Sequence, residues 1–202
     1  MTTRREFLQG VLAASGFALS GSALGSTLSG LAGSGAQVPV QTAVFEPEFA
    51  ASAQFGAVTG RLGLQTFALE GSDITPLWTE HLMALWRERP AAIAGLTTQM
   101  PLFLLERFGW DHGLRVVFRA EHRAADDFSV RHQLEGPEPM LSVFRTLSAR
   151  HDYGSCLAAV LKECPERISS SSNTALTAQS AAVPEVPLYS WVIAPRSVLT
   201  AA

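Results

Sequence analysis

The feature that most constrains this chain is the alternation of two hydrophobic patterns in its middle third. Residues 62–71 and 91–98 read as short strands, and residues 114–122 alternate apolar with polar side chains, which is the period of a strand. Between these segments, residues 75–89 and 99–112 place apolar side chains at helical spacing. The order strand, helix, strand, helix, strand predicts an α/β domain with right-handed parallel crossovers.

Signals for helix starts and ends support this order. Thr75 is a natural N-cap with Pro76 at the first helical position, and Pro90 ends that helix. Pro101 lies in the first turn of the second helix, and Gly113 can close this helix in a left-handed conformation. Both helices are therefore expected to connect parallel strands.

The remainder of the chain is expected to complete the same domain. Residues 123–139 contain acidic, glycine and proline residues and are predicted to form a long loop. Helices are expected near 140–150 and 155–164, and the Ser- and Thr-rich stretch 168–183 is predicted to be a flexible surface loop. Residues 187–195 are apolar and β-prone, so the chain returns to the sheet. The predicted fold class is α/β, with a small, mainly parallel sheet and flanking helices.

The first residues of the chain carry a different signal. Arg4 and Arg5 precede a moderately apolar segment over residues 8–31, which is the layout of a secretory signal. The sequence Thr-Arg-Arg-Glu-Phe-Leu at residues 3–8 resembles the twin-arginine (Tat) export signal, with Gln9 in place of the frequent lysine. Glycine and serine dilute the apolar segment, so a permanent membrane anchor is not expected.

The resemblance to Tat signals implies both an address and a domain boundary. Tat cargoes fold before they are exported, so the resemblance implies a periplasmic protein whose first partner is the Tat export machinery. The small residues Ser-Gly-Ala at 34–36 predict cleavage before Gln37, with Ala-Leu-Ser at 18–20 and Gly-Ser-Ala at 21–23 as alternative sites. The predicted organisation is a signal peptide over 1–36, an Ala-rich arm or leading helix over 37–60, and a single α/β domain over 61–202.

The charge content excludes one class of protein, and the cysteine spacing argues against a disulfide. Without the charges of the predicted signal, 13 basic side chains remain against 17 acidic ones, so the chain lacks the basic field that nucleic-acid binding needs. Cys156 and Cys164 lie on one predicted helix, where the helical rise separates their Cα atoms by about 12 Å. A disulfide needs a separation below about 7 Å, so these cysteines are expected to stay unbridged.

Candidate ligand-binding residues follow the ends of the predicted strands, because open α/β sheets bind ligands beyond the carboxyl ends of their strands. Thr97 and Thr98 stand at a helix N-terminus, which offers free N–H donors and favours a small anionic ligand. The alternative is that these threonines and Ser72 simply cap helices. The predicted ligand-binding set is Ser72, Asp73, Thr97, Thr98 and Arg123.

Candidate catalytic and metal-ligating residues cluster around the third predicted strand. His122, next to Glu121, is a residue type whose ordinary pKa suits general acid–base catalysis. His122, His132 and either Asp126 or Asp127 could hold a metal ion, because imidazole and carboxylate are both metal ligands. Their spacing matches no known metal motif, and the alternative is that they are solvated loop residues.

No motif assigns a reaction or a cofactor. The chain lacks the Gly-x-Gly-x-x-Gly, phosphate-loop, His-Glu-x-x-His and haem-attachment patterns. The leading hypothesis is an exported accessory or small-ligand-binding protein without catalytic activity of its own, acting beside a larger periplasmic enzyme. The alternatives are a periplasmic metal-assisted hydrolase using His122, His132 and an aspartate, and a structural domain whose histidines have no chemical role.

Overall fold

The computed structural model of the protein describes residues 38–195, with the exception of residues 127, 166 and 169. The predicted signal peptide over residues 1–36 lies outside the described residues. No helix of the described part combines the length and the apolarity that a bilayer crossing requires.

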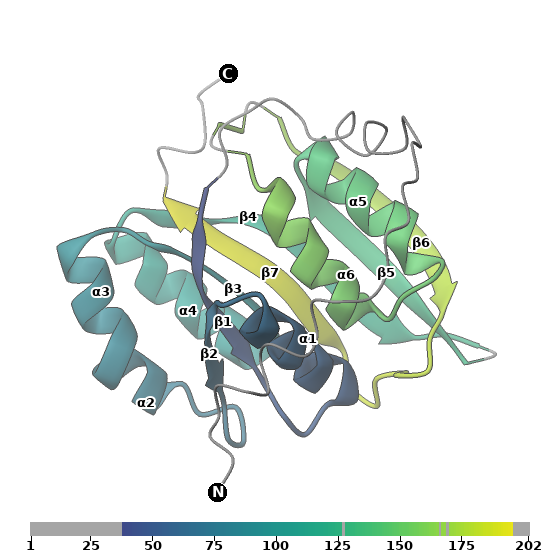
Figure 1. The fold of residues 1–202 in the computed structure, drawn as a ribbon, viewed down its shortest axis with the longest axis horizontal. Helices are drawn as coiled ribbons and strands as arrows, with labels where there is room; N and C mark the ends of the chain where they lie inside the picture. Colours follow the sequence, from purple (N-terminus) through teal and green to yellow (C-terminus); the bar gives the residue numbers. More distant parts are fainter. Residues whose placement is uncertain (1–37, 127, 166, 169, 196–202) are drawn as a thin grey trace, which may run out of the picture. The chain divides into compact units, whose positions relative to one another are not determined.

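Within the described residues, seven strands form one mixed sheet in the order β2-β1-β3-β7-β4-β5-β6 (Figure 1). Strand β1 pairs in parallel with β2 and β3, whereas every other neighbouring pair is antiparallel. The strands are β1 (Val40–Phe45), β2 (Gln65–Ala68), β3 (Ala92–Thr97), β4 (Leu114–Ala124), β5 (Ser129–Gly136), β6 (Ser172–Gln179) and β7 (Leu188–Pro195).

Helices cover the two faces of the sheet unequally. One face, called here the α6 face, packs against α1 (Ala50–Arg61), α5 (Glu138–Ser148) and α6 (Tyr153–Val160). The opposite face, called the α4 face, packs against α4 (Gln99–Asp111) and a helical segment made of α2 (Thr75–Leu77), a π-helical turn (Trp78–Leu82) and α3 (Met83–Glu88). Figure 1 shows α5 and α6 in front of β4 and β5, and α4 behind the sheet towards β3.

The four strands β1 to β4 end at the same edge of the sheet. Strands β1, β2 and β3 are mutually parallel, and both β3 and β4 run antiparallel to β7, so β4 has the direction of β3. Thr97 of β3 and Glu121 of β4 are both in register with Tyr189 of β7. The ends of these strands define what we call the carboxyl edge, and this edge gathers the predicted site residues of the middle third.

The α/β class is confirmed, but the expectation of a mainly parallel sheet is wrong. Parallel pairing is confined to β1, β2 and β3, and the last strand, β7, enters the sheet antiparallel between β3 and β4. Gly95 allows this insertion, because a Cβ atom there would lie 2.2 Å from the indole of Trp191 on β7.

Two predicted loops are strands. Residues 123–139 were expected to be a loop, but β4 and β5 form a hairpin whose turn is only residues 125–128. The Ser- and Thr-rich stretch 168–183 contains β6, the outermost strand of the sheet beside β5. Its polar composition reflects its position, because only every second side chain of β6 is partly buried.

Residues 37–60 do not form an arm. They contain β1, which lies between β2 and β3 in the sheet, and most of α1. The expected leading helix is therefore present, but a central strand precedes it. Phe55 of α1 is fully buried in the core of the α6 face, so this segment belongs to the α/β body.

Candidate functional site

The predicted residues at the carboxyl edge gather around Glu46, a residue that the sequence analysis did not select. The hydroxyl of Ser72 and the backbone N–H of Thr98 both donate hydrogen bonds to the fully buried Glu46 carboxylate. The Thr98 hydroxyl donates a further bond of 3.1 Å to Glu46 Oε1. Ser72 adopts a left-handed backbone conformation with φ 63°, which is uncommon for a residue other than glycine.

Glu46 takes the position that an external anion was expected to occupy. Thr98 is the N-cap of α4, and the start of a helix favours negative charge and offers free N–H groups. Because the chain supplies its own carboxylate there, Ser72 and Thr98 act as internal donors. A sequence signal was available, since Glu46 and Glu48 are the only charged residues in the stretch 37–60.

Asp73 and Thr97 have structural roles in the described part of the chain. Asp73 Oδ1 accepts a hydrogen bond of 2.8 Å from the Thr75 N–H at the start of α2, and the hydrogen bonds from Thr75 lower the pKa of Asp73. Thr97 is buried, and its hydroxyl accepts a bond of 3.0 Å from the indole N–H of Trp191. Capping and core packing therefore account for both residues.

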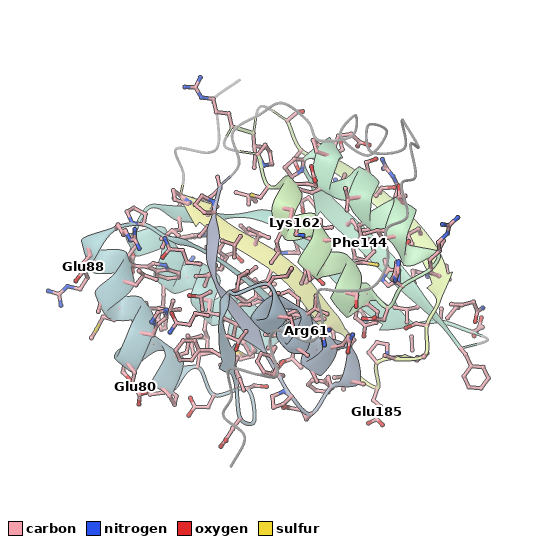
Figure 2. The ribbon with its side chains drawn as sticks, in the orientation of Figure 1. Arg61, Glu80, Glu88, Phe144, Lys162 and Glu185 are labelled. Carbon is pink, nitrogen blue, oxygen red and sulfur yellow. The ribbon has the colours of Figure 1, made fainter. Side chains whose placement is uncertain are left out.

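The two candidate histidines are core residues of the α6 face, so their interpretation as solvated loop residues is wrong. His122 of β4 and His132 of β5 are directly paired across the strands and are 0 % and 1 % exposed. Their Nδ1 atoms are 2.7 Å apart, and His122 Nε2 lies 2.7 Å from Ser190 Oγ. Phe144 of α5, labelled in Figure 2, stacks on His122 with ring centroids 5.9 Å apart.

Burial keeps both imidazoles neutral. It lowers the pKa of His132 from 6.5 to about 4. For His122, burial, followed by the repulsion that a protonated His132 would exert, holds the pKa well below 6.5. Ser190 beside His122 resembles a nucleophile beside its general base. However, the side chains of Ser190, His122 and His132 are all enclosed in the core. This arrangement therefore serves as a buried hydrogen-bond network that cross-links β4, β5 and β7.

The structure does not assemble the predicted metal site from its described residues. Within that part of the chain, no group of three His, Cys, Asp or Glu side chains is arranged to hold a metal ion. Asp126 lies in the exposed hairpin turn, where its backbone carbonyl accepts a bond of 2.6 Å from Ser129 Oγ. Asp127 lies outside the described residues.

Glu121 and Arg123 point to the α4 face, away from His122, because successive side chains of a strand alternate between faces. Glu121 Oε1 accepts hydrogen bonds from Arg123 Nε at 2.8 Å and from the Tyr189 hydroxyl at 2.7 Å. Burial raises the pKa of Glu121, but these hydrogen bonds and the charge of Arg123 outweigh it, so the pKa lies below its usual value. Glu121 and His122 therefore cannot form one catalytic pair.

This part of the α4 face contains a hollow of about 630 Å³ over β4, β5, β6 and β7. We call it the open-face hollow. Its size is that of a small-molecule site, and its walls combine charged, amide and phenolic side chains. Its lining comprises Arg119, Glu121, Gln133, Leu134, Glu135, Asn173, Thr174, Ala175 and Tyr189.

Arg119, which lines the open-face hollow, has one unsatisfied hydrogen-bond donor. One guanidinium nitrogen, Nη2, bonds Glu106 Oε2 of α4 at 2.7 Å. The Nε–H of the same guanidinium is buried and has no hydrogen-bond acceptor among the described residues. Glu135 lies directly opposite Arg119 in the register of β4 and β5. Nevertheless, within the described chain no cation lies at ion-pair distance from Glu135.

The two cysteines belong neither to the residues around Glu46 nor to the open-face hollow. Cys156 and Cys164 are both free and buried in the core of the α6 face, but only Cys156 lies on α6, because Cys164 follows the 3-10 turn Leu161–Glu163 in an extended conformation. Burial raises the pKa of Cys156 to about 12 and that of Cys164 to about 11, so neither thiol is prepared for nucleophilic chemistry.

Comparison with known proteins identifies no relative. No family model, no curated protein and no solved structure matches the chain.

Proposed function

We propose that the protein binds a small zwitterionic molecule of the amino-acid type in the open-face hollow and does not convert it chemically. The observation that most supports this is the buried Arg119 Nε–H, which has no acceptor in the described structure. A buried donor without a partner costs about 1–3 kcal/mol, and native proteins leave few of them. A ligand carboxylate that enters the hollow and displaces the groups covering this N–H would remove this cost.

Arginine suits such a ligand because its guanidinium presents several N–H groups in a fixed plane. The bond from Arg119 Nη2 to Glu106 holds the guanidinium in place, so little side-chain entropy remains to be lost on binding. A hydrogen bond between a guanidinium and a carboxylate is also about twice as strong as one between neutral groups. Arg119 is therefore the proposed contact for the negative end of the ligand.

Glu135 is the proposed contact for the positive end of the ligand. It lines the same hollow and stands opposite Arg119 across the β4–β5 pair, where directly paired side chains have Cβ atoms about 5 Å apart. The hydrogen bonds from Tyr189 and Arg123 hold Glu121 at the neighbouring wall. A carboxylate and an ammonium group joined by one carbon atom match this short separation of opposite charges.

The export hypothesis and the accessory role remain part of the proposal. The Tat-like N-terminus favours a periplasmic protein, and α4 favours a second function as a docking subunit. Met100, Phe103 and Trp110 on α4 are 58 %, 53 % and 42 % exposed. The guanidinium of Arg107 lies 4.3 Å from the ring centre of Trp110. Methionine, aromatic residues and arginine are the types enriched in protein interfaces.

Calorimetric titration with L-amino acids of different side-chain size tests the binding proposal. For the tightest L-amino acid, the N-acetyl derivative and the carboxamide are then titrated separately. Removing the ammonium charge is expected to weaken binding through Glu135, and removing the carboxylate is expected to weaken it through Arg119. Each loss is expected to be at least about tenfold, as for a charge-assisted hydrogen bond of 1.5–3 kcal/mol.

Two arginine variants provide the matched comparison. Arg119→Lys keeps a cation near Glu106 but lacks the Nε–H, so it is expected to weaken amino-acid binding. Arg131→Lys changes an exposed arginine of β5 that does not line the hollow, so it is expected to bind as the parent protein does. The proposal fails if no amino acid binds, or if both variants bind with the affinity of the parent.

A further inference from the structure

Strand β6 is an open edge of the sheet. In the described structure it pairs with β5 alone and stands last in the strand order, on the right in Figure 1. The other edge strand, β2, has only four residues, and shortness is one way in which proteins protect an edge from other chains. Strand β6 has eight residues, and its register with β5 is unbroken from Ser172 to Gln179. It therefore offers a partner much more backbone than β2 does.

Strand β6 lacks the features that usually protect a long edge strand. These features are charged side chains, above all lysine, together with proline residues and bulges. The sequence of β6 is Ser-Asn-Thr-Ala-Leu-Thr-Ala-Gln, which contains neither a charge nor a proline, and its pairing with β5 contains no bulge. An unprotected edge of this length is suited to pair with a further strand.

The hydrogen bonds between β5 and β6 show which residues of β6 face outwards. The backbone N–H of Ser180 donates to the Phe128 carbonyl at 3.2 Å, and this pair continues the register of the two strands. Bonded and non-bonded pairs alternate along an antiparallel ladder, so the even-numbered residues of β6 bond β5. The odd-numbered residues turn their N–H and C=O groups outwards, and in the described chain no backbone hydrogen bond joins them to another segment. These residues are Asn173, Ala175, Thr177 and Gln179.

We propose that β6 pairs antiparallel with β6 of a second copy of this chain, around a two-fold axis at Leu176, so that the two sheets join into one. A two-fold axis brings the same surface of both copies together. In this register each outward-facing residue meets another outward-facing residue. Asn173 lies opposite Gln179 of the second copy, and Ala175 lies opposite Thr177 of the second copy.

The side chains of β6 suit an identical strand as the partner. Leu176 packs against the core of the α6 face but stays partly exposed. On the two-fold axis it faces Leu176 of the second copy in a non-bonded pair, whose Cα atoms lie about 4.5 Å apart, so the two leucines shield each other from water. Like charges directly opposite each other destabilise a strand pair, and the uncharged sequence of β6 creates none.

This pairing is independent of the proposed amino-acid site. Asn173, Thr174 and Ala175 also line the open-face hollow, but the pairing uses the outward backbone groups of β6 and needs no ligand. The contact of one strand pair is small compared with the roughly 1,600 Å² of a standard stable interface. The expected dimer is therefore reversible and concentration-dependent, and failure of either proposal leaves the other intact.

Sedimentation velocity of the purified chain over a range of concentrations is the first test. The mass is expected to rise towards twice that of one chain as the concentration increases. Thr177→Pro deletes an outward N–H but no bond to β5, a position where edge strands tolerate proline, so it is expected to abolish the dimer and to keep a folded monomer. Thr177→Val keeps the N–H and the branched side chain, so it is expected to form the dimer as the parent chain does.

Cysteine cross-linking tests the register and does not depend on the proline variant. Leu176→Cys is expected to give a covalent dimer on mild oxidation, because residue 176 meets its own copy within the reach of a disulfide, about 7 Å between Cα atoms. Thr177→Cys, which lies opposite Ala175 of the second copy, is expected to lose this cross-link. The native cysteines are both buried and do not compete. A chain that stays monomeric at every concentration, a dimer that Thr177→Pro leaves intact, or cross-linking of Thr177→Cys in place of Leu176→Cys would each overturn the proposal.

Discussion

The buried pair His122 and His132 predicts that the protein loses stability in mild acid. Burial lowers the pKa of His132 from 6.5 to about 4 and holds that of His122 well below 6.5. In the unfolded chain both histidines bind protons as the pH falls through their ordinary pKa near 6.5, whereas the folded pair does not. The unfolded state then holds more protons, so the free energy of unfolding falls as the pH falls.

The size of this loss follows from the pKa of His132. For one such histidine, the free energy of unfolding falls by about 1.4 kcal/mol for each pH unit below the unfolded pKa. Protonation of His132 in the unfolded chain therefore lowers the free energy of unfolding by about 2 kcal/mol at pH 5 and about 3 kcal/mol at pH 4. His122 adds to the loss in the same direction, but less than independently, because the two imidazoles interact at 2.7 Å.

Urea unfolding at pH 7, 6, 5 and 4 measures this loss directly. The double variant His122→Phe/His132→Leu is expected to lose most of the pH dependence between pH 7 and 5. His151→Gln, which changes an exposed histidine after α5, is expected to keep it. Equal free energies of unfolding at pH 7 and 5 in the parent protein would refute the neutral buried pair.

Two further predictions concern the core. Gly95→Ala is expected to lower the free energy of unfolding by about 3 kcal/mol or to prevent folding, because the added methyl group would lie 2.2 Å from the indole of Trp191; equilibrium unfolding in urea checks this, and unchanged stability would contradict the packing of β7 against β3. Cys156 and Cys164 are expected not to react with Ellman's reagent until the protein unfolds, because both are buried and burial raises the pKa of both thiols; rapid labelling of the native protein would show that the α6 face opens.

The α/β class could be predicted because the segments from β2 to β4 carry local signals. Thr75, Pro76 and Gly113 mark helix boundaries that the structure reproduces within a few residues. The direction of β7 carries no such signal, since a strand has the same side-chain period in either direction. Its antiparallel insertion depends on a tertiary contact, the indole of Trp191 over Gly95.

The sequence of β5 carries a strand signal, which the loop-forming residues nearby outweighed in the sequence analysis. Val130, His132 and Leu134 point inward while Arg131 and Gln133 are exposed, which is a clear period of two. The nearby acidic, glycine and proline residues favoured a loop instead. As a result, His122 and His132 were predicted to be metal ligands or solvated loop residues, and their contact in the core was missed.

The open-face hollow could not be predicted, because it arises from strand order and register. Arg119, Glu135, Asn173 and Tyr189 come from four strands, and three of these strands join the sheet in an order that the local pattern does not determine. Glu46 was missed for a different reason: Glu46 and Glu48 stand out in a stretch without other charges, but a carboxylate after a strand has many roles, and only the fold brings Ser72 and Thr98 to Glu46.

The Nε–H of Arg119 provides the most direct test of the proposed amino-acid site. Its ¹H–¹⁵N signal can be followed by NMR while an L-amino acid is added to the purified protein. We expect a downfield shift of the Nε–H proton and slower exchange with water as the ligand carboxylate becomes its acceptor. An Arg119 signal that stays unchanged at saturating concentrations of every amino acid would contradict binding in the open-face hollow.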